Sequence, residues 1–408
     1  MEERIAMFLA FETGAFSASE LATRYGISRE TFYFWKRRRE SGDPGWFFDR
    51  PSAPGSRPSR TDETIAAAVV AMRRRFPRFG PKKLRAKLLE KDPSVSWPAA
   101  STMGEILKRA GLIESRRRAR RPVDRGAIVH DGMAPNDEWS IDFKGWFRTK
   151  NGTRVDPLTV VDTASRYLLM VEIVPPTHDG VQAALERLFK ETGMPGAIRS
   201  DNGPPFGAAG AGGLSRLSAW LLRLGIDVRF IPPSSPQDNG RHERMHRELK
   251  AETARVPAAC EAGQQERFDA FRHHYNEERP HEALDQTPPA RHWSAPVRRL
   301  PGSVPLPWYD AEHEVRKVGR KGEITWRGRE IFVSEALAGE MIGLRELAGG
   351  GHLARFCERE LGLISEAGHF VRFAPPRARV RRAAERTATP SHAGAADPPA
   401  GRSGCQAA

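Results

Sequence analysis

The sequence predicts a multidomain protein with an all-α N-terminal part, a central α/β domain and a small β-barrel in its C-terminal part. Three observations predict this class. Helix start and stop signals dominate residues 1–114, strand and helix patterns alternate over residues 131–300, and short strands separated by glycine turns fill residues 305–374. A chain of 408 residues is long enough for about two to four such domains.

Charge is unevenly distributed along the chain, whose formal net charge is +14. Residues 1–125 carry 27 lysines and arginines against 15 acidic residues, residues 126–300 carry 22 against 23, and residues 301–408 carry 16 against 13. A strongly basic segment favours a polyanionic partner, most simply nucleic acid. The distribution therefore predicts a DNA-binding module followed by a near-neutral module that performs chemistry.

The first helical unit occupies residues 1–45. Ser17 and Glu20 have the spacing of a capping box, a glycine turn follows at residues 25–27, and Ser28 is placed to cap a second helix. This order resembles a helix-turn-helix, and a generic three-helix bundle with a solvated basic end is the alternative. Residues 46–60, rich in proline, glycine and serine, are predicted as a linker. The second helix ends in the candidate DNA-binding residues Arg37, Arg38 and Arg39.

A second helix-turn-helix unit is predicted over residues 61–114. Thr61 is placed to cap its first helix, Gly80 to open the second, either Pro98 or Ser101 to open the third, and Gly111 to end it. A basic linker follows at residues 115–130, which we interpret as tracking DNA, with a disordered solvated linker as the alternative. The candidate DNA-binding residues of both segments are Lys82, Lys83, Arg116, Arg117, Arg118, Arg120 and Arg121.

The central domain, residues 131–300, is predicted as a mixed α/β sheet in which three strands are followed by helix, strand, helix, strand and helix. The predicted strands are Trp139–Phe147, Leu158–Val161, Tyr167–Val174, Ala197–Ser200 and Asp227–Ile231, and the predicted helices are Val181–Glu191, Leu214–Leu224, Asp238–Thr253 and Gln264–Glu277.

Two aspartates end predicted strands of this domain. Asp142 lies where Trp139 and Ile141 alternate to one face, so its side chain points to the other face with Ser140. An aspartate in a core strand is unfavourable unless it is paired or bound to metal. Asp201 follows a short strand and precedes Asn-Gly, which places it at a strand's carboxyl edge, where ligand sites of α/β sheets concentrate.

Glu243 opens a helix near the end of the domain. At helical spacing, Arg247 and Lys250 share its face, while Met245 and Leu249 turn to the opposite, packing face. Such a helix suits contact with DNA phosphates, which makes Arg247 and Lys250 DNA-binding candidates. Taken singly, each carboxylate is more typical of a turn or an ion pair, but three of them could converge to hold two divalent metal ions for phosphodiester chemistry.

Three segments together resemble the DDE integrase-core family. They are Ser-Asp-Asn-Gly-Pro-Pro-Phe at residues 200–206, Pro-Gln-Asp-Asn-Gly-Arg-His-Glu-Arg at residues 236–244 and Tyr-Asn-Glu-Glu-Arg-Pro-His at residues 275–281. The resemblance is to bacterial insertion-sequence transposases of the IS481-like and IS3-like type, with retroviral integrases as more distant relatives. It covers about residues 130–295, and the order of two helix-turn-helix units, core and β-domain also fits the family.

The resemblance implies an RNase H-like core in which Asp142, Asp201 and Glu243 are the catalytic residues and hold two Mg²⁺ or Mn²⁺ ions. It also implies cleavage and strand transfer of double-stranded DNA, namely the element's terminal repeats and a target, by a homo-oligomer. The sequence departs from the family pattern in one spacing, because 243 − 201 − 1 = 41 residues separate Asp201 from Glu243, a few more than usual. The surplus coincides with the glycine-rich residues 207–213, and Glu248 is the rival glutamate.

Other acidic and histidine residues of the central domain are expected to have structural roles. Asp162 precedes a turn, so a capping role is expected, and His281 in Arg-Pro-His is expected to pack rather than bind metal; no cysteine pair accompanies His273, His274 and His281. Two rival functions are a DNA-binding regulator without activity and a nonspecific nuclease. The complete carboxylate set argues against the first, and two recognition units argue against the second.

The remaining features concern the ends and the compartment. Residues 375–408 are expected to be disordered, since alanine, arginine, proline and serine dominate them. The three cysteines are scattered without a CxxC pair, and no run of eighteen apolar residues occurs, so we expect no membrane span. A bacterial cytoplasmic protein associated with the nucleoid is the expected location.

Overall fold

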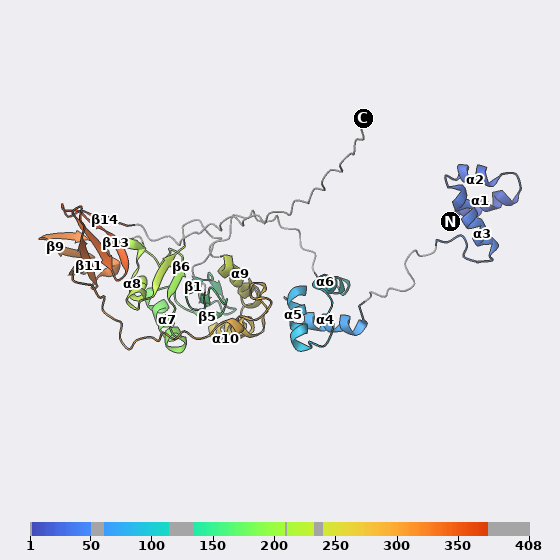
Figure 1. The fold of residues 1–408 in the computed structure, drawn as a ribbon. Coiled ribbons are helices and arrows are strands. Elements are labelled where there is room, and N and C mark those ends of the chain that lie inside the picture. Colours follow the sequence, from blue (N-terminus) through green and yellow to red (C-terminus); the bar gives the residue numbers. More distant parts are fainter. Residues whose placement is uncertain (1, 50–60, 114–133, 209, 232–239, 374–408) are drawn as a thin grey trace, which may run out of the picture. The chain divides into compact units, whose positions relative to one another are not determined.

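The computed structural model describes residues 2–49, 61–113, 134–208, 210–231 and 240–373 (Figure 1). It divides into two compact units, Met1–Thr64 and Ile65–Ala408, which are described separately. Most of the predicted linker 46–60 lies outside the described residues, as do the whole predicted linker 115–130 and the whole predicted tail 375–408. No helix of the described residues is long and apolar enough to cross a membrane.

The N-terminal unit contains α1 (Glu2–Glu12), α2 (Ala18–Arg24) and α3 (Arg29–Glu40). The predicted caps are confirmed, because Ser17 and Glu20 form a complete capping box and the Ser28 side chain accepts from the backbone of α3. Gly26 makes the turn between α2 and α3 with φ +64°, a conformation that favours glycine. Buried side chains from all three helices, among them Phe8, Leu21, Phe32 and Trp35, form the unit's own core.

The second unit begins with α4 (Glu63–Arg75), α5 (Pro81–Lys91) and α6 (Ala100–Arg109), which share a separate apolar core. The prediction that Thr61 caps the first helix is wrong. The Asp62 carboxylate accepts from the Thr64 amide at 2.7 Å instead, one residue further along. Gly80 precedes α5 as predicted, but Ala99, rather than Pro98 or Ser101, stands before α6.

The central sheet has five strands in the order β5-β4-β1-β6-β7. Strands β5 and β4 pair antiparallel with each other and with β1, whereas β6 and β7 continue from β1 in parallel. The sheet is therefore mixed, as predicted. The strands are β1 (Glu138–Phe143), β4 (Pro157–Asp162), β5 (Leu168–Ile173), β6 (Ala197–Ser200) and β7 (Asp227–Phe230).

The first predicted strand, Trp139–Phe147, is broken in the structure. Strand β1 ends at Phe143, and Gly145 with φ +85° separates it from a short hairpin of β2 (Phe147–Arg148) and β3 (Arg154–Val155). A positive φ interrupts the extended backbone that a ladder needs, and alternation of side chains alone does not reveal it.

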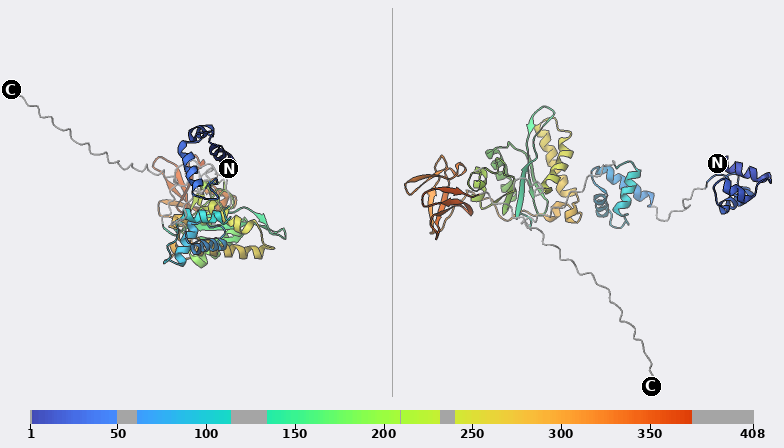
Figure 2. Two further views of the ribbon diagram at one scale, coloured as in Figure 1. Left: turned by 90° about the vertical axis from the view of Figure 1, so that its right-hand side faces the viewer. Right: turned by 90° about the horizontal axis from the view of Figure 1, so that it is seen from above.

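Helices cover both faces of the sheet (Figures 1 and 2). On one face, α7 (His178–Thr192) and α8 (Arg216–Arg223) pack on Trp139, Ile141 and Ile198. On the other face, α9 (Gly240–Leu249) and α10 (Glu261–His273) pack on Val161 and Val171. Helices α9 and α10 each continue into a π-helical turn, Lys250–Ala254 and His274–Glu278.

The C-terminal part is an antiparallel sheet of order β14-β13-β12-β11-β8, with a separate hairpin of β9 and β10. Strands β8 and β14 are opposite edges of that sheet, so within residues 313–372 the hydrogen bonding does not close into the predicted barrel. Trp326, Val318 and Leu337 of this part belong to the same apolar cluster as α8, which joins it to the central domain. The strands are β8 (His313–Lys317), β9 (Glu323–Trp326), β10 (Arg329–Phe332), β11 (Met341–Glu346), β12 (His352–Phe356), β13 (Arg359–Ile364) and β14 (Phe370–Arg372), and the 3₁₀ turns are Ala211–Gly213, Glu282–Leu284, Pro289–His292 and Glu335–Leu337.

Candidate active site

The parallel pairing of β1 with β6 brings the two candidate aspartates together. Its register matches Glu138 with Ala197 and Ser140 with Arg199. Continued for two residues, past the end of β6 at Ser200, this register would place Asp142 (140 + 2) opposite Asp201 (199 + 2). Neighbouring strands lie about 4.8 Å apart, so the two aspartates occupy adjacent positions at the carboxyl edge of the parallel half of the sheet.

Asp142 lies on the face of β1 that α9 covers. Trp139 and Ile141 enter the apolar core of the opposite face, so the predicted alternation is confirmed. In the antiparallel ladder Asp142 pairs with Thr159, whose hydroxyl donates to the Asp142 backbone carbonyl at 2.9 Å. The adjacent Lys144 ammonium is partly desolvated, which lowers its pKa despite its attraction to Asp142.

Asp201 lies in the turn that follows β6. Its Oδ1 accepts from the Gly203 amide at 3.2 Å, and the Asn202 side chain donates to the Ile231 carbonyl at 3.0 Å, which ties the turn to the end of β7. The side chain is exposed to solvent, but nearby protein atoms still desolvate the carboxyl and raise its pKa, against the opposing effect of the Gly203 amide.

Glu243 lies in the first turn of α9 on its exposed face, together with Arg247 and Lys250. Met245 and Leu249 are buried against β4, β5 and α10, so the predicted separation of faces is confirmed. A carboxylate in the first turn of a helix is stabilised by the backbone amides there.

Glu248, the rival glutamate, is engaged elsewhere. Its carboxylate pairs with Arg279 at 2.9 Å and with Arg78 at 3.6 Å, and the Arg279 side chain is only 7% exposed. This ion pairing favours Glu243 over Glu248 as the glutamate available to a metal.

Two histidines of α9 were missed by the sequence analysis. His242 and His246 are four residues apart and buried against β1 and β4. Their Nε2 atoms lie 2.6 and 2.8 Å from Thr159 Oγ1, and His242 Nδ1 lies 2.9 Å from Ser140 Oγ. The usable signal was their spacing on the helix face that also carries Met245 and Leu249.

These histidines form, with Asp142, the one cluster of three metal-ligating side chains found within the described residues, with ligand atoms within 4.8 Å of one another. Asp201 and Glu243 are outside that cluster. Burial lowers the pKa of His242 to about 3 and that of His246 to about 2, so both imidazoles are neutral at ordinary pH.

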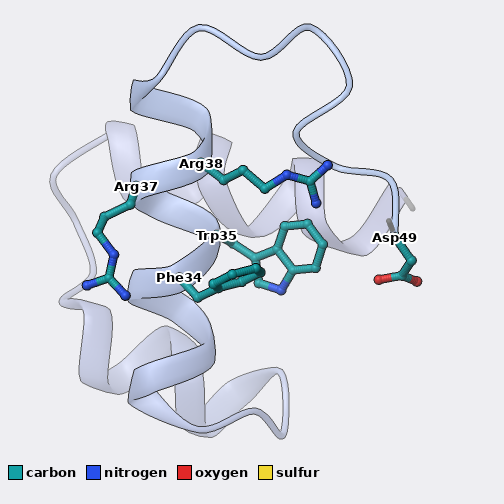
Figure 3. Close-up of a pocket in the computed structure, with 5 residues that line it drawn as sticks. All are labelled: Phe34, Trp35, Arg37, Arg38 and Asp49. Carbon is teal, nitrogen blue, oxygen red and sulfur yellow. The ribbon is translucent and has the colours of Figure 1, made fainter. Parts of the chain in front are cut away.

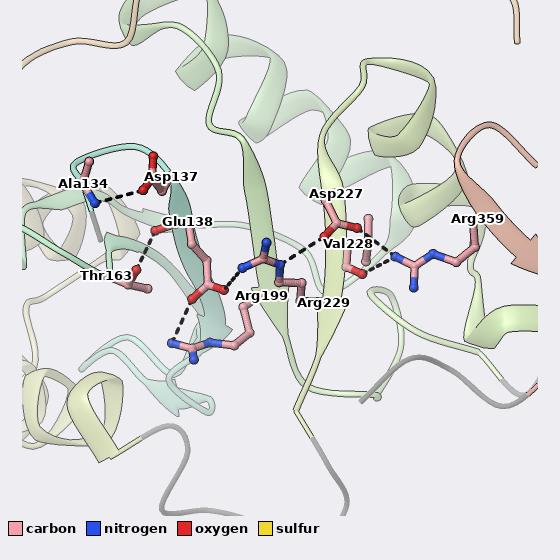
Figure 4. Close-up of polar contacts among 9 residues, drawn as sticks. All are labelled: Ala134, Asp137, Glu138, Thr163, Arg199, Asp227, Val228, Arg229 and Arg359. Carbon is pink, nitrogen blue, oxygen red and sulfur yellow. Dashed lines mark hydrogen bonds and ion pairs between the residues drawn. The ribbon is translucent and has the colours of Figure 1, made fainter. Parts of the chain in front are cut away.

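A buried ion-pair network fixes the parallel half of the sheet (Figure 4). Glu138 of β1 lies between Arg199 of β6, at 3.4 Å, and Arg229 of β7, at 3.1 Å. Arg229 also pairs with Asp227, which in turn pairs with Arg359 of β13 at 3.1 Å. The network thus links the strands that carry Asp142 and Asp201 to the C-terminal sheet.

Asp162 and His281 have the structural roles that the sequence predicts. Asp162 is fully buried and accepts from the backbone amides of Asn136 and Ser165, which confirms its capping role. Asp156 pairs with Arg154 at 2.8 Å. His281 packs edge-on against Tyr275, and burial lowers its pKa to about 3.

The N-terminal candidates for DNA contact differ in their surroundings. Arg37 is exposed, whereas Arg38 turns back over Trp35 (Figure 3) and donates to the Phe48 and Gly45 carbonyls at 2.8 and 3.1 Å. Arg39 pairs with Glu12 at 2.6 Å. Of Arg37, Arg38 and Arg39, Arg37 is therefore the best placed to contact DNA.

The remaining candidates for DNA contact also differ in exposure and in their contacts. Lys82 is exposed and pairs with Glu282 at 2.6 Å, while Lys83 lies beside the Phe79 ring, where burial lowers its pKa to about 8. Arg247 is exposed on α9, and Lys250 is exposed at the start of the π-helical turn that follows it. The candidates Arg116, Arg117, Arg118, Arg120 and Arg121 lie outside the described residues.

Comparison with known proteins places these features in a family. Two family models, each described as an integrase core domain, match residues 132–236 and 224–289. The chain is 30% identical over 240 residues to the insertion element IS407 uncharacterized 31.7 kDa protein of Burkholderia multivorans, covering 58% of this chain and 82% of that protein. It is 29% identical over 240 residues to the insertion element IS476 uncharacterized 39.2 kDa protein of Xanthomonas euvesicatoria. That match covers 57% of this chain and 66% of the relative.

Among solved structures, the HTLV-2 integrase catalytic core domain in complex with magnesium (dimeric form) is 15% identical, with a TM-score of 0.29; the match covers 40% of this chain and 97% of that chain. The fold and the matched models define a DDE-type polynucleotidyl transferase. The chain belongs to the DDE transposase/integrase family, with insertion-element proteins among its relatives.

Proposed function

We propose that this protein is the DNA transposase of an insertion sequence, which binds the element's ends, cleaves them and joins them to target DNA by in-line phosphodiester displacement. The observation that carries the proposal is the parallel register that makes Asp142 and Asp201 neighbours at the carboxyl edge of β1 and β6. Helix α9, which carries Glu243 in its first turn, packs on the face of the sheet to which Asp142 belongs.

The donor set fits hard divalent cations. Asp142, Asp201 and Glu243 would hold Mg²⁺ or Mn²⁺, because carboxylate oxygens are the ligands these ions prefer. Two such ions, when bound, supply activation of water or of a DNA 3′-hydroxyl and stabilisation of the leaving oxygen. The raised pKa of Asp201 is consistent with a carboxylate that gains from a nearby positive charge.

The protein's own part is positioning. The two strand-end aspartates are fixed by the β1–β6 pairing, and Glu243 is presented to solvent, where a DNA strand has access. Arg247 and Lys250 share that exposed face and would neutralise backbone phosphates beside the scissile bond. No side chain needs to become covalently attached to DNA in this scheme.

The proposed partners are double-stranded DNA, in the form of terminal repeats and target, and further copies of this chain. The excess of 27 basic over 15 acidic residues in residues 1–125 supports DNA binding by the N-terminal helical units, which we propose act as helix-turn-helix modules. A protein with this task would work in the bacterial cytoplasm at the nucleoid.

The decisive experiment is joining of DNA that contains the inverted repeats flanking the gene. Full-length protein with Mg²⁺ or Mn²⁺ should cleave and join these ends, and EDTA should abolish both steps. Asp142→Asn and Asp201→Asn should bind the ends but not join them, whereas Asp156→Asn, which removes a surface ion pair, should keep activity. Joining in EDTA, or by Asp142→Asn at the wild-type rate, would contradict the proposal.

A further inference from the structure

The hydrogen bonds around Thr159 assign the protons of both buried histidines. The hydroxyl has one proton, which it donates to the Asp142 carbonyl, an atom that can only accept. The Nε2 atoms of His242 and His246, 2.6 and 2.8 Å from the same Oγ1, must therefore be the donors. A ring that donates through Nε2 can offer Nδ1 as an acceptor or as a metal ligand.

The two Nδ1 lone pairs have different surroundings. That of His242 accepts from the Ser140 hydroxyl at 2.9 Å, so both nitrogens of this ring are used and His242 acts as a positioning residue for Thr159. That of His246 lies 3.9 Å from Asp142 Oδ2. This separation leaves room for a cation that both atoms bind.

The geometry suits a metal ion. Bonds from a divalent transition metal to nitrogen and oxygen ligands are about 2.0–2.2 Å long, so two of them span the 3.9 Å separation. The His246 side chain is only 10% exposed and its orientation is fixed by the Nε2 bond to Thr159, as is usual for histidine ligands.

We infer that His246 supplies its Nδ1 as a nitrogen ligand to the ion that Asp142 holds, so that this centre takes a divalent transition metal such as Mn²⁺ in preference to Mg²⁺. Imidazole nitrogen favours transition metals, whereas sites made only of oxygen suit Mg²⁺. The inference rests on the proposed metal-binding role of Asp142 and deepens it, because it states which atoms surround that ion.

The test is pulsed electron paramagnetic resonance of Mn²⁺ bound to the full-length protein. Nitrogen modulation should be present in the wild type and should change when its histidines carry the heavy nitrogen isotope, which requires no substitution. His246→Gln should abolish the modulation, because glutamine keeps a donor for Thr159 but lacks Nδ1. The exposed His273→Gln is the matched control and should leave the modulation unchanged.

Metal affinity gives a second readout. His246→Gln should raise the dissociation constant for Mn²⁺ by about tenfold or more and change that for Mg²⁺ far less. The inference is overturned by Mn²⁺ that binds without nitrogen modulation, by modulation that survives His246→Gln, or by absence of Mn²⁺ binding. The two proposals fail separately. DNA joining without nitrogen modulation would contradict His246 as a metal ligand, whereas nitrogen modulation without DNA joining would contradict the transposase activity.

Discussion

Glu243 and Glu248 lie on one helix, but their surroundings separate their roles. Glu243 is exposed in the first turn of α9, whereas Glu248 holds Arg279 and Arg78 in an ion-pair cluster. Both residues are glutamates, so their type does not distinguish their roles; the solvent exposure of Glu243 and the ion pairs of Glu248 do.

Glu243→Gln should reduce end joining by roughly a hundredfold to a thousandfold, since a lost metal ligand removes several kcal/mol of transition-state stabilisation. Glu248→Gln should instead lower the melting temperature while activity per folded molecule stays close to wild type. Joining rates and thermal melts of both variants decide this. Near wild-type joining by Glu243→Gln would move the assignment to Glu248.

Lys83 should make folding stability depend on alkaline pH. Burial, with a smaller repulsion from Arg279, lowers its pKa from 10.5 to about 8. Between these values the unfolded chain binds the extra proton, so stability should rise with pH through this window and the full penalty should be present below pH 8. Lys83→Met should raise the unfolding free energy at pH 7 by roughly 2–3 kcal/mol at most and flatten this rise. Urea unfolding at pH 7 and at about pH 9.5 measures both effects, and parallel curves for the two proteins would refute the prediction.

The arginines at the C-terminal end of helix α3 differ in their surroundings. Arg37 faces solvent, and Arg38 is used to hold residues 45–48 of its own unit. Arg37→Ala should therefore weaken binding of end DNA and reduce the salt slope by about 1, as expected for one lost phosphate contact. Arg38→Ala should mainly lower the thermal stability of the N-terminal unit. Fluorescence anisotropy across a salt series, with melting curves, separates the two, and an unchanged salt slope for Arg37→Ala would contradict its role.

Glu138 links strands β1, β6 and β7 through ion pairs with Arg199 and Arg229, and its side chain is only 3% exposed. Glu138→Gln should destabilise the protein by about 3–5 kcal/mol, because it removes a buried negative charge that faces both Arg199 and Arg229. Asp156→Asn is the control, since it breaks the half-exposed pair with Arg154 and should cost no more than about 1 kcal/mol. Equal losses of unfolding free energy in the two variants, measured by urea unfolding, would contradict a larger contribution from the Glu138 ion pairs.

At the scale of the whole molecule, one proposed metal site per chain has to serve two element ends. A symmetric assembly supplies two such sites at a fixed spacing, so the competent complex should contain at least two copies of this chain. Light scattering of the full-length protein with paired end DNA should give the mass of a dimer or larger. Paired-end joining by a complex of one protein and one end would refute this.

The C-terminal sheet is better tested by substitution than by removal of residues 305–408. Trp326, Val318 and Leu337 share an apolar cluster with α8, so truncation would expose apolar surface of the core. Lys317, Arg320 and Lys321 are exposed, and their replacement by glutamate probes contact with target DNA without disturbing that cluster. Normal joining by the triple variant would exclude these residues from target binding.

Local sequence patterns predict the types of most elements, the caps Ser17 and Ser28 and the strand alternation at Asp142, and three short segments carry the resemblance to the family. Periodicity and capping chemistry are local, so they are readable from neighbouring residues. The sequence did not reveal the break at Gly145, the capping by Asp62 or the open C-terminal sheet, because a positive φ, a one-residue choice of cap and strand closure are not encoded in side-chain alternation.

The contacts between residues that are distant in sequence depend on the tertiary structure. Thr159 and His246 are 87 residues apart, yet they hydrogen bond because the register of β4 with β1 and the packing of α9 bring them together. The same packing buried Lys83 and committed Glu248 to Arg279, although the sequence presented both as available surface residues. Strand register and helix docking are set by the packing of many distant side chains at once, so they are properties of the folded chain rather than of any local pattern.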